Sequence, residues 1–430
     1  MDQLFAPDGV IQDAQALAAA AYGAQESFFL VNGSSGGLIA GLLALCQPND
    51  LVVVPRNCHQ SIIHGLVLSG ARPIWITPPI DSDSGLAQCI TAEQVRLTLK
   101  KYPEAKGVIA VSPSYEGICG DISALAAIAH HHDIPLIVDE AHGAHFNFHP
   151  GLPTSALHQG ADIVVQSWHK TLGALSQASV LHLQGERIGV QQLKQALTFI
   201  QTSSPNYLLL ASLDASRQQM ALRGEALLTD SIAIALKLRH SLQSLETIGV
   251  LQSTQNFDID PLRLTLLLGQ SHLSGFELDE RLSTEFGIIA ELPSQNSLTF
   301  VLGQGITENQ TQNLRWALEK IDRQYRKIKP ESEQSKNEVE TPKIGKVSKI
   351  SPRQAYYSPS KSLDRQSAIG QICKHIICPY PPGIPLLFPG EEISQQAVQT
   401  LNALEAYGCQ IIGCSSESID IIPQSMNHQK

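Results

Sequence analysis

Lys170 is the residue whose position first indicates chemistry. It follows Ser167 and His169, directly after an apolar segment at residues 162–166 that is typical of a buried strand. A lysine at a strand end inside a sheet is costly to bury unless its amine is neutral or covalently engaged. A Schiff base with an aldehyde would provide that engagement. Taken alone, the position also suits an ordinary surface lysine.

Asp139 ends the preceding predicted strand, residues 135–139, and His142 comes three residues later. Two neighbouring parallel strands would bring the carboxylate of Asp139 and the amine of Lys170 to one cleft. Pyridoxal 5′-phosphate requires this pair, because an acid beside the pyridine nitrogen keeps the ring protonated and an amine holds the aldehyde. The alternative role for Asp139 is a helix N-cap.

A glycine- and serine-rich segment, residues 32–37, lies between a predicted strand and an apolar helix. Backbone amides, serine hydroxyls and the positive end of a helix can together bind a phosphate. The segment matches neither the dinucleotide nor the P-loop pattern. It is a candidate phosphate site, and an ordinary capped turn is an equally good interpretation.

His59 follows the predicted strand at residues 51–55. An imidazole at that strand end could stack on the face of a pyridine ring. A solvent-facing loop histidine is the alternative.

Apolar and amphipathic segments alternate through the first two hundred residues. The predicted strands are residues 27–31, 51–55, 73–77, 107–112, 135–139 and 162–166, and the predicted helices are one ending at residue 46, 60–69, 91–101, 122–131 and 154–159. This alternation predicts an α/β fold, with a mostly parallel sheet covered by helices on both faces. In such sheets the chemistry gathers at the carboxyl ends of the strands, where the candidate residues lie.

Composition divides the chain into four predicted parts. They are a large domain at residues 1–205, a helical and small α+β region at 206–328, a polar linker at 329–350, and a C-terminal domain at 351–430. The α+β region has predicted strands at 263–268 and 298–302 and a helix at 310–328.

The 430 residues are 43% hydrophobic with a formal net charge of −10, which predicts a large core and argues against nucleic-acid binding. Eight cysteines without a C-x-x-C pair do not favour a metal site. No export signal is visible, and the apolar run at 38–46 is too short to span a bilayer. These features predict a cytoplasmic protein with reduced thiols and no membrane partner.

Residues 165–179 resemble the cofactor-lysine signature of the bacterial ornithine/lysine/arginine decarboxylases throughout. Residues 32–37, 57–59, 201–207 and 379–391 also resemble landmarks of that family, so the likeness covers nearly the whole chain. The resemblance implies a fold-type-I pyridoxal-phosphate-transferase architecture, like that of aspartate aminotransferase. It further implies decarboxylation of a basic amino acid, a role in polyamine biosynthesis, and a homodimer or higher homo-oligomer.

The family also implies roles for the matching residues. Those that would hold the cofactor are Lys170 at the aldehyde, Asp139 at the ring nitrogen, His59 on the ring face, and Ser34, Ser35, Gly36, Ser167 and His169 at the phosphate. His142 would approach the phenolic oxygen of the ring or the substrate, and His169 or Lys170 would protonate the α-carbon. Thr202 and Ser203 would reach the cofactor of a neighbouring subunit.

Family members carry a further segment, rich in proline, histidine and glycine, ahead of the residues equivalent to 8–15. This sequence begins close to that point. Either translation starts upstream of Met1, or the chain lacks part of the shared site. The second interpretation leads to an alternative function, an inactive homologue that binds pyridoxal phosphate or dimerises and regulates an intact decarboxylase.

Two further questions stay open at the level of sequence. Another fold-type-I reaction, such as an aldolase or an acyl transfer, is a second enzyme alternative. The distal group of a basic substrate needs an acidic or polar partner, for which Glu116, Asp121 and a residue of a partner subunit are candidates.

Overall fold

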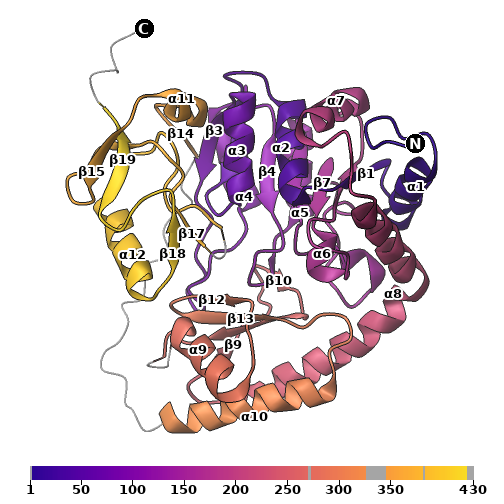
Figure 1. Cartoon of the computed structure of the whole chain (residues 1–430), viewed down its shortest axis with the longest axis vertical. Coiled ribbons are helices and arrows are strands. Elements are labelled where there is room, and N and C mark those ends of the chain that lie inside the picture. The colour runs from indigo at the N-terminus through magenta and orange to yellow at the C-terminus, as the bar shows by residue number, and fades with distance from the viewer. Residues whose placement is uncertain (1, 270–272, 326–344, 381–382, 424–430) are drawn as a thin grey trace.

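The computed structural model describes residues 2–269, 273–325, 345–380 and 383–423. Within these residues, an eight-stranded sheet in the order β1-β8-β7-β6-β4-β2-β3-β14 forms the centre of the largest part (Figure 1). Its strands are β1 (Glu26–Leu30), β2 (Leu51–Pro55), β3 (Arg72–Ile76), β4 (Val108–Val111), β6 (Leu136–Asp139), β7 (Ile163–Gln166), β8 (Ser179–Leu183) and β14 (Lys346–Val347). Neighbours from β3 to β7 pair in parallel, whereas β8 and β14 pair antiparallel to theirs.

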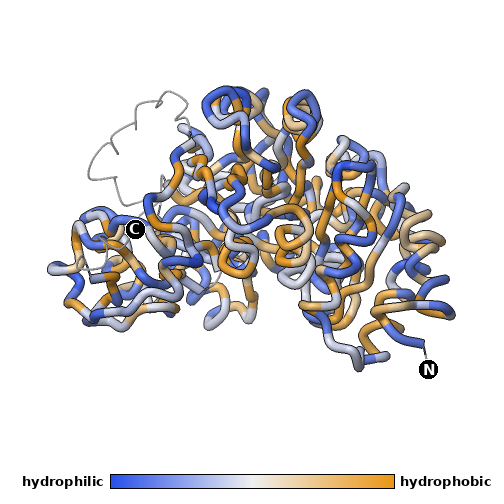
Figure 2. The backbone as a smooth tube through the Cα atoms, turned by 90° about the horizontal axis from the view of Figure 1, so that it is seen from above, coloured by the Kyte–Doolittle hydropathy of each residue, from blue (hydrophilic) through white to orange (hydrophobic). Residues whose placement is uncertain are grey.

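Helices cover both faces of this sheet, because successive strand residues point to opposite sides. Ile137 belongs to the apolar cluster that contains residues of α2, α3 and α7, whereas its neighbour Val138 belongs to the cluster that contains residues of α1, α4, α5 and α8. The helices are α1 (Val10–Tyr22), α2 (Gly33–Leu45), α3 (Gln60–Ser69), α4 (Ala92–Lys101), α5 (Ile122–His131), α7 (Val190–Ile200) and α8 (Tyr207–Leu242), with the short η1 (Phe146–Phe148) and α6 (Trp168–Thr171) between strands. Figure 2 shows hydrophobic segments running through the interior and hydrophilic turns at the outer edge.

The long helix α8 leads to a smaller α+β region (Figure 1). Its four-stranded antiparallel sheet has the order β12-β13-β11-β9. The elements are β9 (Gly249–Val250), β11 (Arg263–Leu267), β12 (Leu292–Pro293), β13 (Ser297–Val301), α9 (Gly275–Phe286) and α10 (Glu308–Tyr325). A two-stranded sheet of β5 (Ile118–Cys119) and β10 (Asp258–Ile259) joins this region to a loop of the large part. That junction brings β11 close to the carboxyl ends of β4 and β6.

The C-terminal part has its own apolar core and two small sheets, β15-β19-β16 and β17-β18. Its elements are α11 (Pro352–Tyr357), β15 (Lys361–Asp364), β16 (Ile372–Cys373), β17 (Cys378–Tyr380), α12 (Gln395–Ala406), β18 (Gln410–Ile412) and β19 (Ser418–Ile422). Phe388 stacks on Trp75 of β3 with 4.2 Å between ring centroids, and Arg56 pairs with Glu391 at 2.7 Å. These contacts attach the C-terminal part beside the sheet.

The predicted mostly parallel α/β fold is confirmed, and the predicted strand ends lie within one or two residues of those observed. Residues 154–159 are a correction, because they form turns and not a helix. The buried carboxylate of Glu140 accepts the N–H of Ala156 at 2.7 Å, which holds this backbone in a turn. Strand β8, helix α9 and the short strands β5, β9, β10 and β12 were not predicted.

The four-part division of the chain stays a prediction, and residues 329–344 of the expected linker lie outside the described residues. Lys346 and Val347 fall at the end of that linker, and the structure places them in β14, paired with Trp75 and Ile74 of β3. In the described part of the chain, no helix is long and apolar enough to cross a membrane.

Candidate active site

The carboxyl ends of β6 and β7 bring Asp139 and Lys170 to one place. These strands are neighbours in the sheet, with Asp139 paired to Val165, and Lys170 follows in α6. Both side chains line a cavity of about 320 Å³. This is the edge at which a parallel sheet gathers its chemistry.

Most of the residues predicted for the site line this cavity. They are Ser34, Ser35, His59, Asp139, His142, Ser167, His169 and Lys170. Gly36 is not among the lining residues; it lies one turn into α2, where a Cβ would come within 2.4 Å of the Asn32 Oδ1, and its role at the cofactor stays a prediction. Thr202 and Ser203 are exposed and do not line the cavity, and their role toward a neighbouring subunit stays a prediction.

Asp139 carries a carboxylate that is only partly satisfied by the protein. The residue is 5% exposed, and its Oδ1 accepts the Ala141 N–H at 3.1 Å. Among the described residues, Oδ2 has no hydrogen-bond partner. Burial raises the pKa of Asp139, and the amine of Lys170 opposes that effect. A cationic N–H donor placed in the cavity would therefore be stabilised by this side chain.

Lys170 lies at one end of a chain of polar contacts. Its Nζ is 3.0 Å from the Nε2 of His142, and Arg263 donates a hydrogen bond to the Nδ1 of the same ring. Burial lowers the pKa of Lys170, and the Arg263 cation lowers it further against the effect of Asp139. Burial also holds the pKa of His142 well below its usual range.

Tyr115 and Arg263 are site residues that the sequence did not indicate as such. The Tyr115 ring lies 4.2 Å from the ring of His142, and the Nζ of Lys170 is 5.2 Å from the Tyr115 ring centroid. Arg263 reaches the site from β11 of the smaller region. The sequence carries one indication of a role for Arg263, because it is the one charged residue in the predicted apolar strand at 263–268.

The N-terminus of α2 forms a wall of the cavity. Gly33 starts the helix with φ of +80°, and nothing lies within 4 Å of the position a Cβ would take. Its N–H donates to the Gln177 carbonyl at 2.9 Å, and the Ser167 hydroxyl donates to the Ser34 hydroxyl at 2.9 Å. Hydroxyls and free amides at a helix N-terminus suit an anionic group.

His59 caps α3 on another side of the cavity. Its Nδ1 accepts the N–H of Ser61 at 3.2 Å, and burial lowers the pKa of the ring to about 4. Gly383 of the C-terminal part packs beside it, with 3.4 Å between the position of a Cβ and the His59 Nε2. Tyr380 and Ile384 also line the cavity, so the C-terminal part closes one side of the site.

Glu116 and Asp121, the two acidic residues considered for a distal substrate group, lie in different settings. Glu116 lines the cavity, and the Ser114 hydroxyl donates to its Oε2 at 2.7 Å. Asp121 caps α5 by accepting the Ala124 N–H at 2.9 Å and is not among the lining residues. Of these two acidic residues, Glu116 is therefore the one that can contact a ligand in this cavity.

The residues fit the expected pyridoxal phosphate. An amine whose pKa is lowered by burial suits an aldehyde, and the unpartnered oxygen of Asp139 suits a protonated ring nitrogen. The open space at Gly33 and the start of α2 suit a phosphate. A neutral His59 can lie against an aromatic ring without charge repulsion from it.

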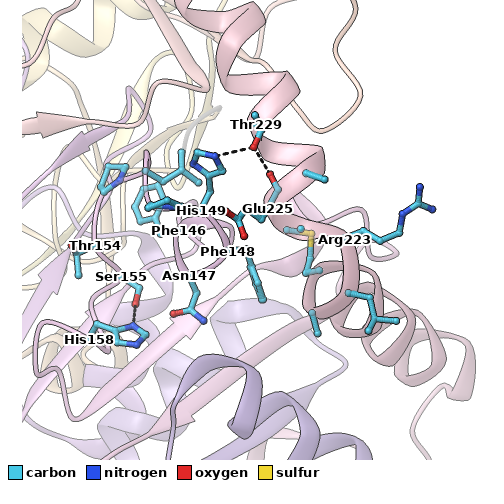
Figure 3. Close-up of a pocket in the computed structure, with 18 residues that line it drawn as sticks. Phe146, Asn147, Phe148, His149, Thr154, Ser155, His158, Arg223, Glu225 and Thr229 are labelled. Carbon is cyan, nitrogen blue, oxygen red and sulfur yellow. Dashed lines mark hydrogen bonds between the residues drawn. The ribbon is translucent and has the colours of Figure 1, made fainter.

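A larger hollow of about 890 Å³ lies between η1 and α8 (Figure 3). Its histidines are engaged within the protein. The Nε2 of His149 is 3.1 Å from the Thr229 hydroxyl, and the Nδ1 of His158 is 2.9 Å from the Ser155 hydroxyl. None of the predicted site residues lines this hollow. Size alone does not make it the site.

Comparison with known proteins gives consistent matches. Two family models match the chain, the Orn/Lys/Arg decarboxylase major domain at residues 1–277 and its C-terminal domain at residues 346–418. The arginine decarboxylase of Bacillus subtilis is 36% identical over 93% of this chain and 82% of that protein. The lysine decarboxylase LdcA of Pseudomonas aeruginosa is 26% identical over 92% and 67%.

Solved structures agree in fold. The lysine decarboxylase LdcF of Francisella novicida superposes with a TM-score of 0.82 at 21% identity, covering 98% of this chain and 73% of that one. An alanine–glyoxylate aminotransferase of Nostoc gives 0.59 at 15% identity, covering 72% and 86%. The second match supports the predicted aminotransferase-like architecture.

Proposed function

The chain belongs to the Orn/Lys/Arg decarboxylase family of pyridoxal-phosphate enzymes, and from that membership we propose that it releases CO₂ from arginine, lysine or ornithine at the cavity around Lys170. The observation that carries this proposal is the shared cavity of Lys170, Asp139 and Glu116. One amine, one buried acid and one further carboxylate are what a basic amino acid and this cofactor require together.

When bound, pyridoxal phosphate supplies an electron sink that accepts the electron pair left at the α-carbon. We propose that Lys170 holds its aldehyde and that Asp139 pairs with its ring nitrogen. His59 would lie on the ring face. The proposed phosphate partners are Ser34, Ser35 and Ser167, all of which line the cavity.

Glu116 is the proposed partner of the distal cation of the substrate. Its Oε2 is held by the Ser114 hydroxyl, which fixes the carboxylate in the cavity wall. An acidic group placed in this way attracts a guanidinium or ammonium and rejects an apolar side chain, which would leave the carboxylate unpaired. The protein therefore selects basic amino acids as a class.

Lys170 is favoured over His169 as the proton donor to the α-carbon. The Nδ1–H of His169 donates to the Ala178 carbonyl at 3.0 Å, so the Nε2 of the neutral ring has only a lone pair. Burial lowers the pKa of His169, and the neighbouring Lys170 adds to that, which disfavours the doubly protonated ring. The Nζ of Lys170 lies 3.0 Å from the Nε2 of His142, within hydrogen-bond distance.

A homodimer is the proposed assembly. Large apolar side chains stand exposed on the chain, with Leu175, next to the lining residue Ser176, 50%, Phe199 81% and Leu208 71% exposed. Such side chains gather where a second chain covers them. Light scattering on the purified chain tests this, and a monomer at micromolar concentration would contradict it. Polyamine biosynthesis and a cytoplasmic location stay predictions.

The test of the function is release of CO₂ from carboxyl-labelled arginine, lysine and ornithine by the purified chain with added pyridoxal phosphate. We expect turnover of at least one of the three, and a visible absorbance band that disappears in Lys170→Ala. A band without CO₂ release from any of them would contradict the proposal and favour the regulatory homologue. Product analysis by mass spectrometry separates decarboxylation from an aldolase or acyl-transfer reaction.

A further inference from the structure

Two buried side chains and the half-buried Lys170, from separate segments, form a continuous line of polar contacts. Arg263, on β11, is 2% exposed and donates to the Nδ1 of His142, which is 4% exposed. The Nε2 of His142 lies 3.0 Å from the Nζ of Lys170. The line therefore runs from the smaller region, through the loop after β6, to the lysine of the site.

The proton positions along this line follow from the chemistry of each group. A guanidinium has N–H donors and no acceptor, so the Nδ1 of His142 must present its lone pair to Arg263. A neutral imidazole has a single N–H, which must then be on Nε2. That N–H faces the Nζ of Lys170. Only an uncharged amine has a lone pair to accept it.

We propose that Arg263 is a positioning residue that fixes the proton of His142 on Nε2 and thereby holds Lys170 as a neutral amine. The neutral amine is the form that can react with an aldehyde, because its lone pair is occupied by a hydrogen bond and not by a proton. This inference rests on the proposed function of Lys170 and goes beyond it, since it assigns a task to a residue of the smaller region.

Other groups also face Lys170 and His142, and they act in both directions. They are Asp139 at the end of β6, His59 ahead of α3, His169 in α6, Tyr115 and Glu116 in the loop between β4 and β5, and Glu291 ahead of β12. The carboxylates of Asp139 and Glu291 favour a charged amine. Arg263 opposes it. The oriented N–H of His142 adds a specific hydrogen bond to that balance.

The fold keeps Arg263 in this place by a close fit. Gly117 has φ of +93°, and a Cβ there would lie 2.5 Å from the Cβ of Arg263, so only glycine lets the arginine stem pass. Asp260 is fully buried nearby and its Oδ2 lies 3.0 Å from the Nε2 of His145. Burial raises the pKa of Asp260, but His145 and then Arg263 outweigh it, so the carboxylate is stabilised in its charged form. Arg263 therefore has a buried counter-charge.

The experiment measures how the reactivity of Lys170 depends on pH in the full chain freed of cofactor. Trace acetic anhydride acetylates neutral amines, and mass spectrometry of the Lys170 peptide, relative to the exposed Lys237, gives the midpoint of the titration. We expect Arg263→Met to raise this midpoint by about one pH unit, a tenfold fall in the neutral fraction at a given pH. In a His142→Phe chain, the same substitution should move the midpoint much less.

Control variants separate the proposed effect of Arg263 through His142 from a direct effect of its charge on Lys170. Arg263→Lys, which keeps a cationic donor, should return the midpoint toward that of the unaltered chain. Arg365→Met removes a buried arginine of the C-terminal part, 6% exposed, and should leave the midpoint unchanged. An equal shift from Arg263→Met with and without His142 would mean direct charge repulsion and would overturn the proposal, as would no shift at all.

A second measurement needs no Arg263 variant and so does not depend on its folding. Nitrogen-15 spectra of histidine-labelled chain, with the His142 signals assigned by their loss in His142→Phe, report the tautomer directly. The Nε2–H form is expected, and the Nδ1–H form would overturn the proposal. Both readouts are independent of CO₂ release, so a failure of the proposed function is recognised separately.

Discussion

At the scale of single residues, Asp139 presents one carboxylate oxygen to the cavity while the other is held by the Ala141 N–H. Asp139→Asn keeps this shape and removes the charge. We expect the cofactor to attach still to Lys170, with its visible band retained, while CO₂ release falls by about a hundredfold or more, because the ring nitrogen loses the acid that keeps it protonated. Stopped-flow absorbance and the labelled-CO₂ assay check both parts.

The control for that substitution is Asp162→Asn. Asp162 is also buried, at 2% exposed, but it pairs with His130 and Arg187 away from the cavity. Its loss should lower stability and leave the rate of the folded fraction unchanged. An equal loss of rate in both variants would mean that Asp139 has only a structural role.

The role of Glu116 at the distal group of the substrate can be tested with Asp121 as the control position. Glu116→Gln should raise KM for the basic amino acid about tenfold or more with a smaller effect on kcat, since the contact is made before and during the reaction. Asp121→Asn alters only the cap of α5, at a cost of about 1 kcal/mol or less, and should leave KM unchanged. Steady-state kinetics decides, and an unchanged KM in Glu116→Gln would remove Glu116 from the substrate site.

At the scale of elements, the glycines of helix α2 allow it to pack closely against the sheet. A Cβ on Gly37 would lie 2.7 Å from the Leu30 Cδ1 and 2.8 Å from the Val165 Cγ1, two buried side chains packed on both sides, so we expect the helix to shift to accept Gly37→Ala. The expected cost is about 1–3 kcal/mol, together with weaker binding of pyridoxal phosphate, because the shift displaces the N-terminus of α2. Urea unfolding and a cofactor titration measure the two effects.

Gly41 provides the comparison within the same helix. Its nearest neighbour from a Cβ position is the Ile137 Cδ1 at 3.5 Å, an ordinary contact. Gly41→Ala should therefore keep cofactor affinity and hold or raise stability, by up to about 1 kcal/mol from helix propensity. If Gly37→Ala and Gly41→Ala have the same effects, the close packing of α2 does not control binding of the cofactor phosphate.

Sequence patterns predicted the elements that carry Asp139 and Lys170, because their strands are short apolar runs bounded by polar turns. The placement of Arg263 could not be predicted in this way. It depends on the pairing of β5 with β10, two-residue strands whose register no local pattern specifies. The turn at residues 154–159 was missed for a similar reason, since a buried carboxylate sixteen residues earlier in the chain decides it.

At the scale of the whole molecule, stability should depend on pH through buried histidines. His182 is fully buried, its Nδ1 2.7 Å from the Ser27 hydroxyl and its Nε2 3.2 Å from the Gln166 Oε1. Burial lowers its pKa to about 3, below the ordinary 6.5. Between these values the unfolded chain binds a proton that the folded chain does not. The contribution of His182 is therefore full above pH 6.5 and is lost as pH falls toward 3.

Urea unfolding at pH 7.5 and pH 5 tests this dependence. The unaltered chain should lose about 2 kcal/mol more stability over that interval than His182→Gln, since each pH unit below 6.5 weakens this contribution by about 1.4 kcal/mol. The variant starts less stable, so the comparison concerns the slope with pH. Parallel slopes would show that His182 does not titrate on unfolding.

The walls of the cavity come from positions as far apart in the chain as Asn32 and Ile384. During synthesis, the ribosome must therefore release most of the polypeptide before the last wall can close over His59. A nascent chain halted before Tyr380 would carry Lys170 and Asp139 in an open, water-filled recess. The lining of this cavity is therefore complete only after the C-terminal part has been synthesised and folded against the sheet.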